Sequence, residues 1–277
     1  VLLPSEFRAL GRHLAGGAGF ISNLVLLRDA GYFDATADLK PFLHLWSLGI
    51  EEQFYIFWPL FLFWLWKISQ VKNGLWIVTL ISFSLCLVLT HNHPVLAFYA
   101  LFTRFWELSI GGSLAYSNLR KPQSQSQNGA AWIGLLLIGL AVGLLHKNSV
   151  FPGWRAMLPT LGAGLLIWAG PKTWLNRKLL SHQWMVGIGL VSYPLYLWHW
   201  PLLSFLRITE PDEPALIWRW SAVAAASLLA SCTYYLIERP LRHNTQRRWL
   251  TAQLCGLMLA LFFGGMMIYF CYFPNST

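Results

Sequence analysis

One segment decides how this chain folds: His44-Leu-Trp-Ser-Leu-Gly-Ile-Glu51-Glu52-Gln-Phe-Tyr55-Ile-Phe-Trp58-Pro59. It opens an apolar run, residues 44 to about 66, that is long enough to cross a bilayer, which takes roughly 20 apolar residues. Two adjacent carboxylates interrupt this run. A charged side chain at the bilayer centre costs about 2.5–3.5 kcal/mol, so an ionisable residue there is a functional candidate by default.

Helical geometry gathers the polar side chains of this segment on one face. Ser47, Glu51 and Tyr55 follow one another at four-residue intervals, and His44 precedes Ser47 by three residues. Glu52 points about a hundred degrees away from this face. Glu51 is therefore a candidate catalytic residue, and Ser47 and Tyr55 are candidate substrate-binding residues. The alternative is that these groups only hydrogen-bond neighbouring helices.

The composition excludes a soluble globular domain. Of the 277 residues, 56% are hydrophobic and only 11% are charged, whereas a soluble domain carries about 25% charged residues. Sixteen Trp and ten Tyr suit the aromatic belts at membrane interfaces. We therefore predict an all-α, polytopic transmembrane helical bundle. Because the net charge of +9 belongs to membrane loops, we expect the lipid bilayer, and no nucleic acid, as a partner.

The apolar runs divide the chain into about eight predicted spans. The runs cover about 44–66, 75–90, 95–116, 130–146, 155–170, 184–206, 217–237 and 250–272. The run at 155–170 is the weakest, because Pro159, Gly162 and Gly164 interrupt it. We predict an extracytoplasmic or interfacial segment at 1–43, a transmembrane domain at 44–273 and an extracytoplasmic tail at 274–277.

The Lys and Arg residues indicate the orientation. Eleven of them lie in the loops after the first, third, fifth and seventh runs, whereas in the alternate loops basic and acidic residues balance. Cytoplasmic loops carry the excess of Lys and Arg. We therefore expect both ends of the chain on the extracytoplasmic side. Residues 121–128 are expected to form a flexible cytoplasmic loop.

Charged residues recur in the third run, where Arg104 and Glu107 stand one helical turn apart. An ion pair between them would lower the cost of both charges in the membrane. A purely structural pair and a role in a binding site are equally compatible with this spacing.

A third polar group lies in the sixth run. Ser192, Tyr196 and His199 share a helical face, and Pro194 and Pro201 open the backbone beside them. A single His between two Trp is more often a hydrogen-bonded packing residue than a base. Because imidazole titrates near neutral pH, a catalytic role stays open.

The depths of these groups predict one cavity. Glu51 lies seven residues, or roughly 10 Å, inside its span, and His199 lies at a similar depth in a span of opposite direction. Arg104 and Glu107 lie nearer the middle of the membrane. We expect a polar cavity from mid-bilayer to the outer face, suited to a small group or a sugar that meets a reagent from the cytoplasm.

Metal and disulfide chemistry have little support in this sequence. The four Cys residues have no paired spacing, and His91 and His93 have no third ligand nearby in the sequence. We predict no metal site.

Taken together, the polar segments resemble the acyltransferase-3 family of integral membrane O-acyltransferases, which includes O-antigen and peptidoglycan O-acetylases. The matching segments lie in the family's order: Leu2–Phe7, Phe42–Tyr55, Thr103–Glu107, Ser192–Leu202 and Glu238–Arg242. The resemblance implies a bacterial inner-membrane enzyme. It would transfer an acyl group, usually acetyl, from cytoplasmic acetyl-CoA or another acyl-CoA to a hydroxyl of an envelope polysaccharide or lipid-linked glycan, such as lipopolysaccharide, O-antigen or peptidoglycan.

The resemblance also implies roles for single residues. Glu51 and His199 would orient the acceptor hydroxyl or carry its proton, and Arg104 would contact anionic donor or substrate. Glu107 matches another polar membrane position of the family, and Tyr196 is a candidate substrate-binding residue beside His199.

The chain departs from the family at its beginning. Family members begin with further spans that bear an Arg and, eleven residues on, the favoured catalytic His, and nothing here matches them. We therefore expect this chain, which begins at Val1, to be the C-terminal part of such a domain and inactive alone. The alternatives are a transporter or flippase of a lipid-linked sugar, whose polar cavity would be a passage, and a non-catalytic membrane subunit.

Overall fold

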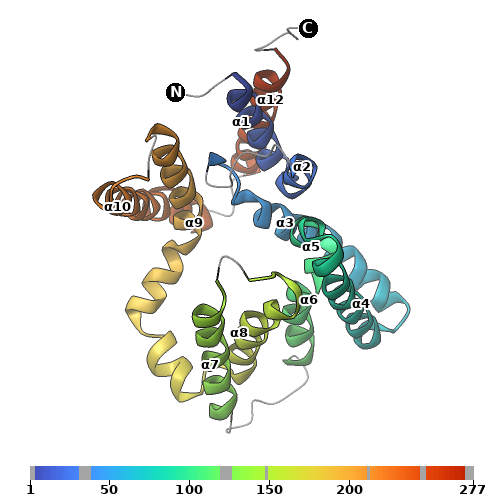
Figure 1. Ribbon diagram of the computed structural model, residues 1–277. Helices are drawn as coiled ribbons and strands as arrows, with labels where there is room; N and C mark the ends of the chain where they lie inside the picture. The colour runs from blue at the N-terminus through green and yellow to red at the C-terminus, as the bar shows by residue number, and fades with distance from the viewer. Residues whose placement is uncertain are drawn as a thin grey trace. The chain divides into compact units, whose positions relative to one another are not determined.

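The computed structural model describes residues 4–30, 39–118, 127–146, 149–210, 213–243 and 248–271. Every regular secondary-structure element within these ranges is a helix or a helical turn, as Figure 1 shows, so the predicted all-α class is confirmed. Most of the predicted cytoplasmic loop at 121–128 and the whole predicted tail at 274–277 lie outside the described residues.

The chain forms two compact units. The first unit contains Val1–Gly49 and Gly187–Thr277, and the second contains Ile50–Val186. Helix α3 (Leu45–Lys67) passes from the first unit into the second, and α9 (Gln183–Thr209) passes back. The other helices of the first unit are α1 (Pro4–Ala18), α2 (Ser22–Asp29), α10 (Leu216–Thr233), the π-helical turn η4 (Tyr234–Glu238), α11 (Arg239–His243) and α12 (Arg248–Cys271).

Helix α1 packs along α12, and Figure 1 shows the two helices side by side in blue and red. Glycines on both helices allow this close contact. A Cβ atom at Gly265 would lie only 2.6 Å from the carbonyl oxygen of Gly11, and one at Gly11 would lie 2.5 Å from the side chain of Ile268. Small residues at such a contact let helix backbones approach closely. The Arg8 guanidinium adds a hydrogen bond of 3.0 Å to the carbonyl of Tyr269.

A buried carboxylate fixes the corner between α1 and α2. Asp29 accepts a charge-assisted hydrogen bond of 2.6 Å from Arg12 and lies 3.0 Å from Nε2 of His13. The side chains of Asp29 and His13 are almost completely buried. Because a buried carboxylate is stable only when it is paired, these contacts keep the two helices together.

The second unit consists of the rest of α3 and several shorter helices. They are α4 (Val71–Asn92), α5 (Pro94–Tyr99), α6 (Leu101–Asn118), α7 (Asn128–Leu144), the 3₁₀ turn η2 (Gly153–Ala156), α8 (Met157–Ala169) and the π-helical turn η3 (Asn176–Leu180). Its core brings together Cys86, Trp106 and Ala156. In the same unit, the buried hydroxyls of Thr79 on α4 and Ser109 on α6 lie 2.7 Å apart and form a hydrogen bond between the two helices.

Helix packing explains why a glycine interrupts the apolar run at 155–170, the weakest predicted span. In α8, a Cβ atom at Gly162 would lie 2.9 Å from the carbonyl oxygen of Gly134 on α7, and one at Gly134 would lie 2.7 Å from that of Gly162. Helices α7 and α8 therefore pack through these two residues, side by side in Figure 1. The glycine that interrupts the apolar pattern is a helix-packing residue.

Three helices of the described residues are long and apolar enough to cross a membrane. They are Val71–Asn92, Leu216–Arg242 and Trp249–Phe270, and Asn128–Leu144 is a shorter apolar helix. The predicted count of about eight spans is not confirmed. One reason is helix length, since α8 has only 13 residues where a span takes about 20.

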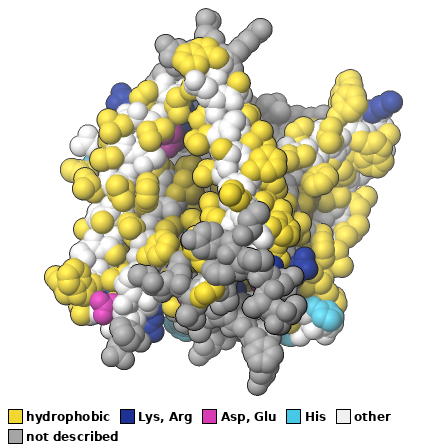
Figure 2. All heavy atoms as spheres, turned by 90° about the horizontal axis from the view of Figure 1, so that it is seen from above, with side chains coloured by type: hydrophobic (Ala, Val, Ile, Leu, Met, Phe, Trp, Pro, Cys, Tyr) yellow, Lys and Arg dark blue, Asp and Glu magenta, His cyan; other side chains and the backbone are white. Residues whose placement is uncertain are grey.

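The surface of the molecule is strongly apolar. Figure 2 shows hydrophobic side chains over most of the visible face that is described. Ile217 on α10 and Met267 on α12 are 70% and 67% exposed. Exposed apolar surface of this extent marks an interaction with a membrane or a protein, and the apolar helices favour the membrane.

Candidate functional site

Four polar side chains of the first unit meet where α3 begins and α9 passes. They are His44, Ser47, Tyr196 and His199, which we call the His44–His199 cluster. Ser47, Tyr196 and His199 are predicted site residues. His44 lies directly before the first residue of α3.

Tyr196 connects the two helices. Its hydroxyl lies 2.8 Å from Oγ of Ser47 and also donates a hydrogen bond to the backbone carbonyl of His44. Because a phenol carries one proton and the carbonyl can only accept, Ser47 donates its own proton to the Tyr196 oxygen. These two hydrogen bonds, from Ser47 to Tyr196 and from Tyr196 to His44, therefore fix the beginning of α3 against α9.

The backbone determines which nitrogen of His199 carries the proton. Its Nδ1 lies 3.0 Å from the carbonyl oxygen of Leu195 and 2.9 Å from that of Tyr196. Both partners are acceptors, so Nδ1 carries the hydrogen, and Nε2 of the neutral ring keeps its lone pair. His199 can therefore accept a proton at Nε2, as a general base must.

His44 is the unusual member of the cluster. Its ring is 7% exposed, and neither ring nitrogen has a hydrogen-bond partner within the described part of the chain. Its centroid lies 5.0 Å from that of Tyr196 and 5.9 Å from that of His199. A buried polar group without a partner is rare in folded proteins and marks a candidate functional site.

Pro201 contributes to the surroundings of His44. As a proline inside α9 it has no backbone N–H, which leaves the carbonyl of Leu197 without its usual helical partner. The Leu197 backbone interacts with the His44 ring, although no hydrogen bond of normal geometry forms. The predicted opening of the backbone at Pro201 thus lies at the cluster.

The remaining predicted residues lie in the second unit. Glu51 is half-buried on α3, and Tyr55, one turn further along, is 58% exposed. That either one shares a site with His199 stays a prediction.

Arg104 and Glu107 also belong to the second unit, on α6. They form the expected ion pair at 3.1 Å, with side chains 12% and 21% exposed, and the Arg104 guanidinium lies 5.2 Å from the centroid of the Phe151 ring. The pairing is confirmed, whereas the site role of the pair stays a prediction.

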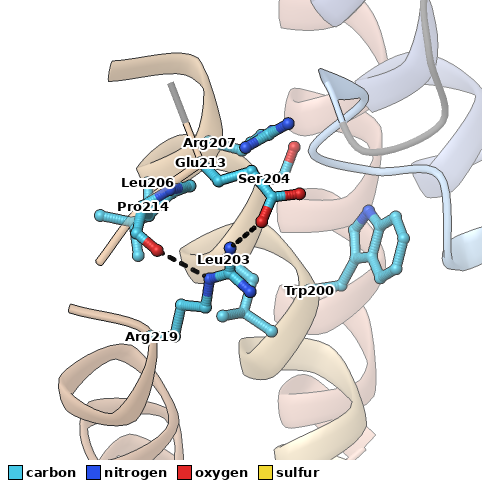
Figure 3. Close-up of a pocket in the computed structure, with 8 residues that line it drawn as sticks. All are labelled: Trp200, Leu203, Ser204, Leu206, Arg207, Glu213, Pro214 and Arg219. Atoms are coloured by element: carbon cyan, nitrogen blue, oxygen red, sulfur yellow. Dashed lines mark hydrogen bonds and ion pairs between the residues drawn. The ribbon is translucent and has the colours of Figure 1, made fainter. Parts of the chain in front are cut away.

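A pocket beyond the cluster was missed by the sequence analysis (Figure 3). It has a volume of about 250 Å³ and lies between the end of α9 and the beginning of α10. Its lining includes Trp200, Ser204 and Arg207, and their spacing of four and three residues was a signal that they share a helical face. The indole N–H of Trp200 donates to the carbonyl of Lys40 at 2.8 Å.

Metal ligands do not gather among the described residues. No three His, Cys, Asp or Glu side chains in those ranges lie close enough to hold a metal ion. Cys86, Cys232 and Cys255 are free thiols, and the side chain of Cys271 lies outside the described residues.

Comparison with known proteins now identifies the family. Residues 9–236 match the acyltransferase-3 family, described as an acyltransferase domain. The chain belongs to this acyltransferase family. The match includes every residue of the His44–His199 cluster and also the Arg104–Glu107 pair, so the resemblance found in the sequence is confirmed.

Several curated proteins are similar to this chain. The peptidoglycan O-acetyltransferase OatA of Listeria monocytogenes is 30% identical over 81% of this chain and 39% of its own length. The putative membrane-bound transacylase BcsY of Komagataeibacter xylinus is 27% identical over 79% of this chain and 56% of its own length. The putative peptidoglycan O-acetyltransferase YrhL of Bacillus subtilis is 29% identical over 78% of this chain and 37% of its own length.

The chain thus spans about two fifths of the OatA and YrhL relatives and somewhat more than half of BcsY. No solved structure matches it.

Proposed function

We propose that this chain is part of a membrane enzyme that transfers an acyl group, acetyl in particular, from acyl-CoA to a hydroxyl of a cell-envelope glycan. The family membership and the relatives named peptidoglycan O-acetyltransferase support the reaction class and favour peptidoglycan as the acceptor. The observation that carries the proposal is the contact of Nδ1 of His199 with two backbone carbonyls, which places the ring hydrogen on Nδ1 and leaves the lone pair of Nε2 to accept a proton.

In the proposed reaction, Nε2 of His199 accepts the proton of the acceptor hydroxyl as its oxygen attacks the acyl carbonyl. The new C–O bond forms the ester, and the C–S bond of the thioester breaks. The proton then leaves with the CoA thiolate, so that the products are acylated glycan and free CoA. General-base assistance of this kind contributes about 10²–10⁴-fold to a rate.

The other polar residues have supporting roles in this proposal. Tyr196 and Ser47 hold the acceptor side of the site in place, and Glu51 orients the hydroxyl or relays its proton. Arg104 contacts the anionic donor or substrate, and Glu107 fixes its guanidinium. The bacterial relatives favour a bacterial cytoplasmic membrane, and the charge distribution of the loops favours an orientation in which both ends of this chain are extracytoplasmic.

The test uses the complete protein in proteoliposomes with acetyl-CoA that carries a labelled acetyl group. We expect label on added peptidoglycan strands, and we expect His199→Gln to lower the transfer rate by about 10²–10⁴-fold. His182→Gln is the matched control, because His182 is an exposed histidine whose Nδ1 accepts a long contact of 3.4 Å from the Trp184 N–H. Movement of unmodified glycan across the bilayer without transfer of label would contradict the proposal and favour a flippase.

A further inference from the structure

The pocket of Figure 3 offers a mixture of polar and aromatic groups. The guanidinium of Arg219 donates to Glu213 at 2.9 Å and to the carbonyl of Pro214 at 2.8 Å, so these three groups form one fixed wall. Trp200 contributes an indole, and Arg207 contributes a second guanidinium from α9. The pocket therefore presents donors, an acceptor and an aromatic surface together.

This chemistry fits a sugar ring better than a simple anion. Glu213 neutralises the guanidinium of Arg219, so a phosphate or sulfate would meet one remaining positive charge of the lining, that of Arg207. Sugar hydroxyls need both donors and acceptors, and the apolar face of a pyranose packs on an aromatic ring. The volume of about 250 Å³ is below the roughly 300–1,000 Å³ of sites for drug-sized ligands, so the pocket suits one ring-sized unit.

Residues that line the pocket lie on the same face of α9 as Tyr196 of the cluster. On α9, Tyr196, Trp200, Ser204 and Arg207 follow one another at intervals of four, four and three residues. His199 and Arg207 are eight residues apart, which corresponds to about 12 Å along the helix. A short oligosaccharide can therefore extend from His199 to the pocket.

Trp200 occupies the boundary between the cluster and the pocket. Its ring centroid lies 6.4 Å from that of His199, and its N–H is fixed by the carbonyl of Lys40. Because the same side chain contacts His199 and lines the pocket, a ligand held in the pocket has a defined position relative to Nε2 of His199.

We propose that this pocket binds a sugar unit of the acceptor glycan, next to the unit whose hydroxyl reaches His199. The inference rests on the proposed function, because it takes a glycan as the acceptor. It predicts that the enzyme prefers a chain of sugars to a single small acceptor.

The test compares acceptors of two lengths with the complete protein in proteoliposomes. For a long peptidoglycan strand, Arg219→Gln and Glu213→Gln are expected to raise KM by about tenfold, as expected for the loss of one hydrogen bond to a charged group, and to leave kcat unchanged. For a disaccharide too short to reach the pocket, both variants are expected to match the unaltered protein. Glu213 is 76% exposed, so its replacement leaves the fold intact.

Arg155→Gln is the matched control. Arg155 is a partly exposed arginine that also donates a solvent-exposed hydrogen bond to a loop carbonyl, that of Val150 at 2.8 Å, but it lies outside the pocket. We expect this variant to have an unchanged KM for both acceptors. An equal effect of the pocket variants on long and short acceptors, or no effect on either, would overturn the inference while label transfer by the unaltered protein still supports the proposed function.

Binding of the glycan in the absence of acetyl-CoA tests the sugar site independently of the proposed acyl transfer. Calorimetric titration with the long strand is expected to show binding that Arg219→Gln weakens, even if no acetyl transfer occurs and the proposed function fails. Displacement of the strand by inorganic phosphate at equal concentration would show that the pocket is an anion site and would overturn the assignment to a sugar.

Discussion

The hydroxyl of Tyr196 lies 2.8 Å from that of Ser47, although the two residues are 149 positions apart in the chain. This contact joins two of the segments that carry the family's polar residues, and the backbone carbonyl of His44 accepts a hydrogen bond from the Tyr196 hydroxyl at the same point. The Tyr196 phenol therefore helps to fix the position of His199 relative to the beginning of α3, together with the hydrogen bond from Trp200 to Lys40.

Tyr196→Phe is expected to remove both hydrogen bonds without a large change in volume. The carbonyl of His44 and the half-buried hydroxyl of Ser47 would each lose a partner, and about 1–3 kcal/mol of unfolding free energy should be lost. Thermal unfolding in detergent measures the stability, and the labelled acetyl assay measures the transfer, which should also fall. Tyr235→Phe is the control, because Tyr235 is exposed; an equal effect in both variants would exclude a special role for Tyr196.

His44→Phe tests whether His44 has a role in acyl transfer or only a role in packing. Because neither ring nitrogen has a hydrogen-bond partner among the described residues, an apolar ring of similar size should keep or raise the melting temperature. Acyl transfer should nevertheless fall if His44 acts on substrate beside His199. Unchanged transfer in a stable variant would leave His44 without a functional role.

Glu51→Gln tests the carboxylate of the segment that opens α3. We expect acyl transfer to be abolished while the protein remains inserted in the membrane, because the amide keeps the shape and loses the charge. Glu52→Gln is the matched comparison, since Glu52 is adjacent in sequence but points to another face of the helix. Full activity of Glu51→Gln would refute an essential ionised group at this position.

Gly265→Ala tests the close contact of α1 and α12. The added Cβ would lie 2.6 Å from the carbonyl oxygen of Gly11, so the helices must separate, at a cost of about 1–3 kcal/mol. Gly264→Ala is a neighbouring control with no heavy atom within 4 Å of the added Cβ, and it should be neutral or slightly stabilising. The melting temperatures of the two variants in detergent check the prediction, and equal values would contradict the contact.

Local patterns in the sequence predicted several features correctly. The composition predicted the all-helical class. The three-residue spacing of Arg104 and Glu107 predicted their ion pair, because both residues lie on one helix and helical geometry alone brings them together. The family was also identified from motifs, since these are read directly from the order of residues.

Span counting from hydropathy was less successful. Apolar runs show where helices can form, but they do not show where each helix ends or which apolar faces pack on protein. The run at 155–170 begins within the 3₁₀ turn Gly153–Ala156, so α8 has only 13 residues, and the glycine at 162 that interrupts the apolar pattern packs against Gly134.

The sequence by itself therefore determined the helical class, the family and the polar face of each helix, because these depend on spacing over a few turns. Only the tertiary structure decided that His44 lies beside His199, that Tyr196 bonds Ser47, and that Arg219 completes a pocket begun by Trp200. These residues are far apart along the chain or on different helices. Which helical faces meet depends on close packing and on hydrogen bonds between helices, and the periodicity of a single segment does not contain that information.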